Sequence, residues 1–125
     1  MIGVQRSIAN RLRMSKMKIV KIATELKRVR RINDEIRYAS SFEEKRFTSG
    51  VIVFRPSKNS NPKRISHDDK DVVCHVLEGR GRLRLIGRRI QLRPGTVCHI
   101  PKGTLHDFAA GKNDELVLFY SLIKT

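Results

Sequence analysis

The second half of the chain is a regular succession of short strand patterns, and this regularity limits the fold more than any other feature. Apolar and polar residues alternate within each run, as in a β-strand with one buried face, and glycine or proline turns separate the runs. Two stretches, residues 67–87 and 92–108, are expected to form antiparallel hairpins with a histidine in each. Many short strands with little helix indicate a β-sandwich or barrel. We expect strands at residues 47–55, 72–78, 81–86, 89–93, 96–100, 105–109 and 115–123.

The first half of the chain is less regular. Residues 1–16 contain basic side chains and no acidic ones, and we expect a basic tail without fixed structure. From residue 17 the pattern fits both an edge strand and a helical stripe, and we expect a strand first and a helical turn from Thr24. Residues 55–66 are rich in proline, asparagine and serine and predict a loop, which at a barrel mouth would border the ligand opening.

Length, charge and cysteine content limit the class of protein. A chain of 125 residues has room for one domain with a core, which we place at residues 17–125. The 27 lysines and arginines against 12 acidic residues give a net charge of +15, which points to an anionic partner without selecting one. Cys74 and Cys98 lie in apolar runs, which indicates reduced thiols in a cytoplasmic protein. No apolar run reaches the roughly 18 residues of a membrane span, and residues 1–16 lack the apolar core of a secretory signal.

One glycine- and histidine-containing motif resembles the cupin family. The second cupin motif is G-x5-P-x-G-x2-H-x3-N, and four of its five fixed positions are present at the family's spacing, while Ala110 replaces the terminal asparagine. These four positions are Gly95, Pro101, Gly103 and His106. The resemblance covers residues 47–123 and, weakly, the segment from residue 17.

The first cupin motif, G-x5-H-x-H-x3,4-E-x6-G, is degraded. Its closing glycine is Gly79, and counting back from it puts Val72 at the position of the family's glutamate. With the four-residue spacing, the two histidine positions fall on Ile65 and His67. With the three-residue spacing they fall on Ser66 and Asp68, so neither register recovers the full ligand set.

The resemblance implies an all-β fold, a double-stranded β-helix or jelly-roll barrel, with a basic N-terminal extension and a motif core at residues 67–110. Cupins are often homodimers that associate through N-terminal strands. Active members hold one divalent ion, usually iron, manganese, nickel or zinc, on three histidines and one glutamate. The family includes dioxygenases, isomerases, decarboxylases and ligand sensors, so the fold alone does not choose the function.

The candidate metal ligands are His67, Asp71 and His106. A divalent ion needs several converging nitrogen or oxygen ligands, because partial coordination does not offset the loss of its water shell. Strand alternation gives the inward direction to Val72 and so turns Asp71 outward unless a bulge intervenes, and Asp68 or Asp69 could contribute from the loop instead. The sequence leaves open both a functional metal and a metal-free pocket.

Strand alternation also predicts which side chains line the barrel. We expect a ligand pocket formed by His67, Val72, Cys74, Cys98 and His106. His75 and His99 point the opposite way and are expected to be packed or interfacial histidines, with a role as a ligand or in proton transfer as the alternative. Asp107 is expected to be a surface partner of an arginine. The arginines of residues 80–93 are expected to lie mostly on the exterior, because leucines occupy the alternate positions.

Three functional hypotheses follow from these patterns. The first is a small cupin that binds a small anionic metabolite in the barrel, with catalysis left undecided. The second is a metal-dependent oxygenase or isomerase that uses His67, His106 and one acid between Asp68 and Asp71. The third is nucleic-acid binding through the basic exterior and tail, which lacks a known motif and lacks aromatic residues interleaved with the arginines.

Overall fold

The described residues form nine strands and one short helix. The computed structural model describes residues 17–57 and 64–125, so the expected basic tail at residues 1–16 lies outside it. The elements are α2 (Ile22–Leu26), β1 (Arg30–Arg31), β2 (Ile36–Glu43), β3 (Phe47–Phe54), β4 (Lys70–Gly79), β5 (Gly81–Leu85), β6 (Arg88–Leu92), β7 (Val97–Ile100), β8 (Asp107–Ala110) and β9 (Leu116–Lys124). In this part of the chain, no helix is long and apolar enough to cross a membrane.

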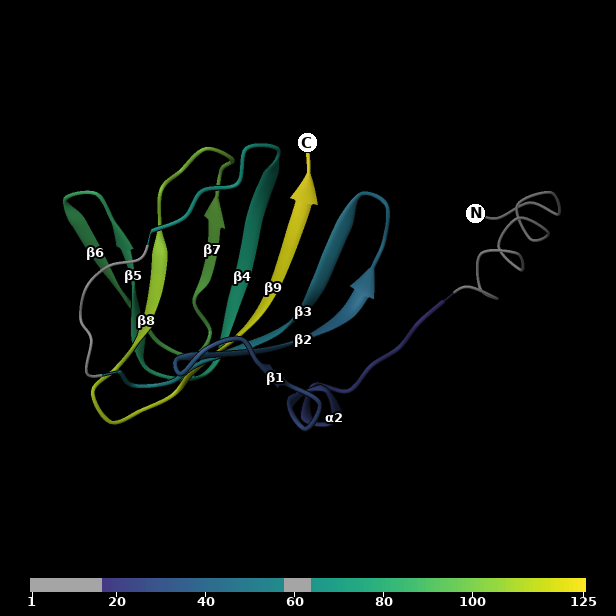
Figure 1. Ribbon diagram of the computed structural model, residues 1–125, viewed down its shortest axis with the longest axis horizontal. Coiled ribbons are helices and arrows are strands. Elements are labelled where there is room, and N and C mark those ends of the chain that lie inside the picture. The colour runs from purple at the N-terminus through teal and green to yellow at the C-terminus, as the bar shows by residue number, and fades with distance from the viewer. Residues whose placement is uncertain (1–16, 58–63) are drawn as a thin grey trace, which may run out of the picture.

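The strands make two sheets, which form the expected jelly-roll barrel (Figure 1). The larger sheet has the order β1-β2-β3-β9-β4-β7, and the smaller has the order β6-β5-β8. Apolar side chains from both sheets meet in one core. Its most buried members are Phe54, Val72, Cys74, Val76, Leu83, Leu92, Ile100, Leu116 and Leu118. The all-β barrel predicted from the strand patterns is confirmed.

The pairing of the strands differs from the two hairpins that we expected. β4 pairs with β7 and β9, whereas β5 pairs with β6 and β8, so β4 and β5 belong to different sheets. The residues from Gly79 to Gly81 therefore form a corner between sheets and not a hairpin turn. Alternation in a sequence tells which face of a strand is buried but not which strand lies beside it, and this is why the prediction was wrong.

The corner requires glycine at residue 79. Its φ angle is +81°, a left-handed conformation that L side chains rarely adopt. A Cβ atom placed there would lie 1.6 Å from the carbonyl oxygen of Glu115, at the start of β9. The backbones of the corner and of the segment entering β9 thus touch directly, with no space for a side chain.

The N-terminal segment has the helical turn expected at Thr24 but not the strand expected before it. The predicted strand from residue 17 is absent, and α2 covers Ile22–Leu26, so the helical spacing of the apolar residues prevails over the strand pattern. α2 contacts β2 and β3. On these two strands Ala39, Val51 and Val53 are buried, although they alternate with the residues that face the barrel interior. The outer face of the large sheet is therefore covered here.

Strand β2 was not predicted from the sequence. Its register against β3 shifts between Ser40 and Phe42, which marks a β-bulge. A bulge inserts one extra residue and so interrupts the alternation that sequence patterns detect. Serine and alanine in its centre add little strand preference, which explains why the segment resembles a loop.

The corner generates a stability prediction. We expect Gly79→Ala to lower the free energy of unfolding by about 3 kcal/mol or more, because the left-handed conformation and the contact with Glu115 each carry a cost. Gly87→Ala is the matched control, since Gly87 has a φ of +70° with nothing within 4 Å of its Cβ position, and it should lose only about 1–2 kcal/mol. Urea unfolding measures both, and equal losses would show that the close approach at residue 79 is unimportant.

Candidate functional site

A cavity of about 340 Å³ opens into the barrel between the two sheets. Strands β2, β3, β4, β8 and β9 contribute most of its wall, and residues 65 and 67 contribute the part that precedes β4. Most of the lining is hydrocarbon or aromatic. The apolar lining residues are Ile32, Ile36, Ile52, Phe54, Ile65, Val72, Phe108, Leu118 and Leu122, with Tyr38 and Tyr120 beside them.

His106 is fixed in this wall by backbone and side-chain bonds. It lies just before β8 and exchanges two backbone hydrogen bonds, of 2.8 and 2.9 Å, with Ile65. The residue as a whole is only 3% exposed. Nδ1 of its ring lies 2.8 Å from the carbonyl oxygen of Thr104. Because a carbonyl only accepts, Nδ1 carries a proton, and Nε2 is the ring nitrogen left for another partner.

His67 faces the same cavity from the segment before β4. Its ring centroid lies 6.0 Å from that of His106. The backbone N–H of Gly103 donates to its carbonyl oxygen at 2.7 Å, which ties the segment to the turn that precedes His106. Burial lowers the pKa of His67 below its usual value of 6.5, and the neighbouring His106 and Lys70 lower it further. His67 is therefore neutral at pH 7.

The four positions that correspond to the family's metal ligands converge on this cavity. Ile65, His67, Val72 and His106 all line it, which agrees with the four-residue spacing of the first motif. Two of these four positions carry hydrocarbon side chains. The cavity therefore lies where the resemblance implies a metal centre, but it supplies two of the four ligand side chains.

The remaining sequence-predicted residues divide between the cavity and other places. Cys74 lines the cavity, but Cys98, its register partner on β7, is not among the lining residues and packs against the core instead. Burial, and next the neighbouring Cys98, raise the pKa of Cys74 to about 12. Its thiol therefore stays protonated near neutral pH and is a poor nucleophile.

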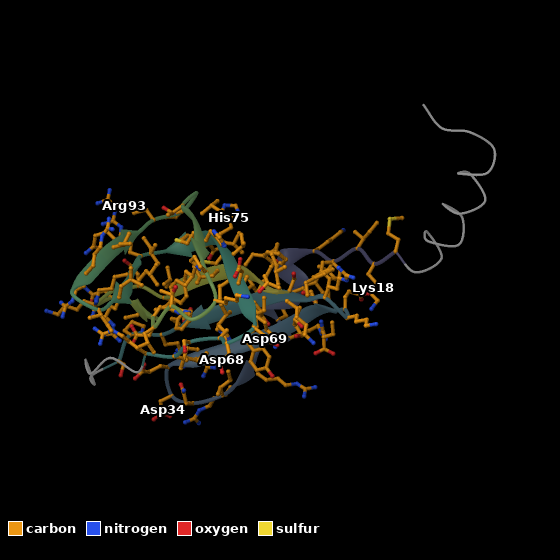
Figure 2. The ribbon with its side chains drawn as sticks, turned by 90° about the horizontal axis from the view of Figure 1, so that it is seen from above. Lys18, Asp34, Asp68, Asp69, His75 and Arg93 are labelled. Atoms are coloured by element: carbon orange, nitrogen blue, oxygen red, sulfur yellow. The ribbon has the colours of Figure 1, made fainter. Side chains whose placement is uncertain are left out.

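Asp71 does not face the two cavity histidines. Its carboxylate accepts a hydrogen bond of 2.9 Å from the backbone N–H of Lys102, and its other oxygen lies 3.0 Å from Nε2 of His99. The bond with His99, and next the bond from Lys102, lower the pKa of Asp71. His99 is exposed, and so is His75, which lies at the periphery of the molecule (Figure 2). These side chains occupy the outer face of the sheet, as alternation predicts.

Arg84 and Asp107 form a buried ion pair that sequence reasoning placed at the surface. The guanidinium binds both carboxylate oxygens, with Nε–Oδ1 and Nη2–Oδ2 distances of 2.7 and 2.8 Å. The expected pairing of Asp107 with an arginine is present, but Arg84 is only 6% exposed, so the exterior position predicted for it is wrong. Both faces of β5 are buried at this point, which alternation cannot reveal. Both residues also line the cavity.

These residues do not fit the metal centre that the family resemblance implies. Within residues 17–57 and 64–125, no group of three or more histidine, cysteine, aspartate or glutamate side chains is placed to hold an ion. Asp68 and Asp69 are exposed, and Asp71 is committed to His99 and Lys102. Two imidazoles in an apolar wall are too few to replace the water shell of a divalent ion.

Comparison with known proteins identifies the family. A family model described as the cupin domain matches residues 50–122, which is more than half of the chain. The chain therefore belongs to the cupin family. No curated protein matches it.

Solved structures share the fold at low sequence identity. The polyketide cyclase RemF from Streptomyces resistomycificus has a TM-score of 0.72 and 21% identity, covering 86% of this chain and 79% of its own. An oxalate decarboxylase, so named by prediction, from Thermotoga maritima has a TM-score of 0.72 and 15% identity over 86% of this chain and 100% of its own. KdgF from Halomonas sp. has a TM-score of 0.65 and 18% identity, covering 78% and 88%. These similarities establish the barrel and not an activity.

Adding ligand side chains at residues 65 and 72 tests whether their absence is the reason that the site does not fit a metal. We expect the double variant Ile65→His with Val72→Glu to gain one divalent ion per chain, because both positions line the cavity beside His67 and His106. The unmodified protein, incubated with the same manganese or zinc salt, should retain much less than one ion after gel filtration. Elemental analysis measures both, and stoichiometric metal in the unmodified protein would contradict the geometric argument.

The titration of His67 tests the electrostatics of the cavity. We expect its pKa, followed by proton NMR, to lie below 6.5, and to rise in His106→Ala because one cause of the lowering is removed. A pKa that is lower in the folded than in the unfolded chain means that folding is favoured above the unfolded pKa. The contribution of His67 to the free energy of unfolding should therefore be lost as the pH falls from its unfolded-state pKa to its folded-state pKa. His99→Ala, on the outer face, should leave the titration of His67 unchanged.

Proposed function

We propose that this protein is a small-molecule-binding cupin whose cavity holds a largely apolar, uncharged ligand with one polar group at His67 and His106. The observation that carries the proposal is the replacement of two metal-ligand positions by Ile65 and Val72 within a cavity whose wall is mostly hydrocarbon. Burial of apolar ligand surface in such a cavity contributes most of the affinity, and a few polar groups fix the orientation.

The charges of the cavity support an uncharged ligand over the anionic metabolite expected from the sequence. Among the described lining residues, Arg84 carries the one permanent positive charge, and Asp107 neutralises it. Glu35 also lines the cavity and adds a negative charge. His67 is neutral at pH 7 because burial lowers its pKa. An anion would lose hydration here without gaining an available cation.

The polar groups that remain suit a ligand that carries a hydroxyl or a carbonyl. Nδ1 of His106 donates to Thr104, so Nε2 is the nitrogen of this ring that a ligand can contact. The phenol of Tyr120 also lines the cavity, and burial raises its pKa while a hydrogen bond with Ser40 opposes that rise. Among the lining groups, a phenol and two imidazoles can bind the polar end of a ligand whose body contacts the aliphatic residues.

The other two hypotheses find less support in the described residues. The metal-dependent oxygenase or isomerase needs a third ligand, and Asp71 points to His99 and Lys102 instead. For nucleic-acid binding, Arg88, Arg89 and Arg93 are exposed, but Arg84 is buried in an ion pair. That hypothesis, a homodimer and a cytoplasmic location stay predictions from the sequence.

Two fluorescent probes that differ in charge test the proposal. N-phenyl-1-naphthylamine is neutral, and 1-anilinonaphthalene-8-sulfonate adds a sulfonate to the same ring system. We expect the neutral probe to bind more tightly, because the sulfonate has no available cation in the cavity. Ile52→Trp, which adds volume to the cavity wall, should weaken binding of the neutral probe at least about tenfold, since overpacking removes the space for it.

The matched control is Ile86→Trp, which adds the same side chain at an exposed position in the β5–β6 turn. It should leave the affinity of the neutral probe unchanged. If the sulfonate probe binds more tightly than the neutral probe, and Ile52→Trp abolishes this binding, the cavity holds an anionic ligand as first expected from the sequence. Equal loss in both tryptophan variants would show that the probe binds outside the cavity.

A further inference from the structure

A second hollow, of about 310 Å³, lies along strand β2 and is separate in character from the barrel cavity. Its wall is polar and basic where that of the cavity is apolar. β1 has only two residues, and it pairs with Arg37 and Tyr38, so β2 beyond residue 38 has no strand on that side in the described part of the chain. The hollow is lined by Lys18, Arg28, Arg30, Tyr38, Ala39, Ser40, Ser41 and Glu43.

A buried carboxylate holds one of the three cations in place. Glu25, on α2, is 3% exposed and accepts a hydrogen bond of 2.6 Å from Ser41 Oγ on β2. Arg28 Nη1 donates to both oxygens of Glu25, at 2.9 and 2.8 Å. These bonds, that from Ser41 above all, lower the pKa of Glu25, which therefore stays ionised at neutral pH. Only Nη1 of Arg28 is used in these bonds, so the other N–H groups of the guanidinium can serve a ligand.

The other two cations reach the hollow from different segments. Arg30 belongs to β1, and Lys18 lies ahead of α2. Lys18 contacts Glu44 at 3.4 Å, but both side chains are about half exposed, and an ion pair of this kind contributes little to stability. Lys18 can therefore exchange Glu44 for another anion at little cost. Glu43 is the one acidic side chain among the residues that line the hollow. Glu25 and Glu44 balance Arg28 and Lys18 from beside the hollow, and Arg30 has no ion pair among the described residues.

We propose that this hollow binds an oxyanion, and specifically the phosphate group of a small phosphorylated molecule. Guanidinium groups match the geometry of phosphate oxygens, and an ammonium adds a point charge without a fixed direction. The anchoring of Arg28 by Glu25 means that less side-chain freedom is lost on binding. This proposal is independent of the ligand of the barrel cavity.

The shape of the site favours a single phosphate group over a nucleic-acid strand. Tyr38 is the one aromatic residue among those that line the hollow, so successive bases would have no row of rings on which to stack. The exposed arginines of β6 and the turn after it lie elsewhere: Lys18 and Arg93 stand at opposite ends of the molecule (Figure 2). A nucleic-acid strand that contacted both basic regions would have to span the distance between Lys18 and Arg93.

Titration of the whole chain with inorganic phosphate and pyrophosphate, by calorimetry at low ionic strength, tests the proposal. We expect Arg30→Ser to weaken pyrophosphate binding about tenfold, because one charge-assisted hydrogen bond is lost. Glu43→Gln should strengthen it about threefold, since one like charge near the anion is removed. Circular dichroism of each variant checks that the fold is retained.

The matched control is Arg93→Ser, which removes the same charge from an exposed position far from the hollow. It should leave pyrophosphate affinity unchanged. An equal loss in Arg93→Ser and Arg30→Ser would show general attraction to a basic surface and overturn the proposal, as would an absence of heat at millimolar phosphate and pyrophosphate. A mixed oligonucleotide that binds more tightly than pyrophosphate, and depends on Arg93, would assign the basic surface to nucleic acid instead.

Discussion

The barrel depends on one close approach of backbones, where Gly79, the last residue of β4, lies against Glu115, the residue just ahead of β9. Because the two chains touch there without side chains between them, the polypeptide can leave the large sheet at the end of β4 and continue in the small sheet as β5. The chain crosses between the two sheets again from β6 to β7, from β7 to β8 and from β8 to β9, and these crossings complete the two opposing walls. The cavity exists because these walls remain separated near His67 and His106 while they meet in the core around Val76 and Leu83.

Within this cavity, the chemistry is determined by what two motif positions no longer supply. Ile65 and Val72 add hydrocarbon where cupins with a metal carry ligand atoms, and burial in the same cavity lowers the pKa of His67. The only permanent cation among the described lining residues, Arg84, is neutralised within the wall by Asp107.

Most of the fold could be predicted from the sequence, because alternation and glycine turns report local geometry directly. The inward direction of Val72 and Cys74 followed from this pattern. Strand partners did not, because pairing depends on residues far apart in the chain. The bulge concealed β2, burial of both faces of β5 concealed the position of Arg84, and Cys98 packs beside Cys74 outside the cavity lining. The residues that line the hollow along β2 come from separate segments of the chain, so no single stretch of sequence predicts it.

The edges of the large sheet are short or interrupted. β1 has two residues, β7 has four, and β2 carries a bulge where it extends beyond β1. A strand from another molecule would find few consecutive N–H and C=O groups to pair with at any of these places. Continuation of the large sheet from one molecule into the next is thus disfavoured at these edges.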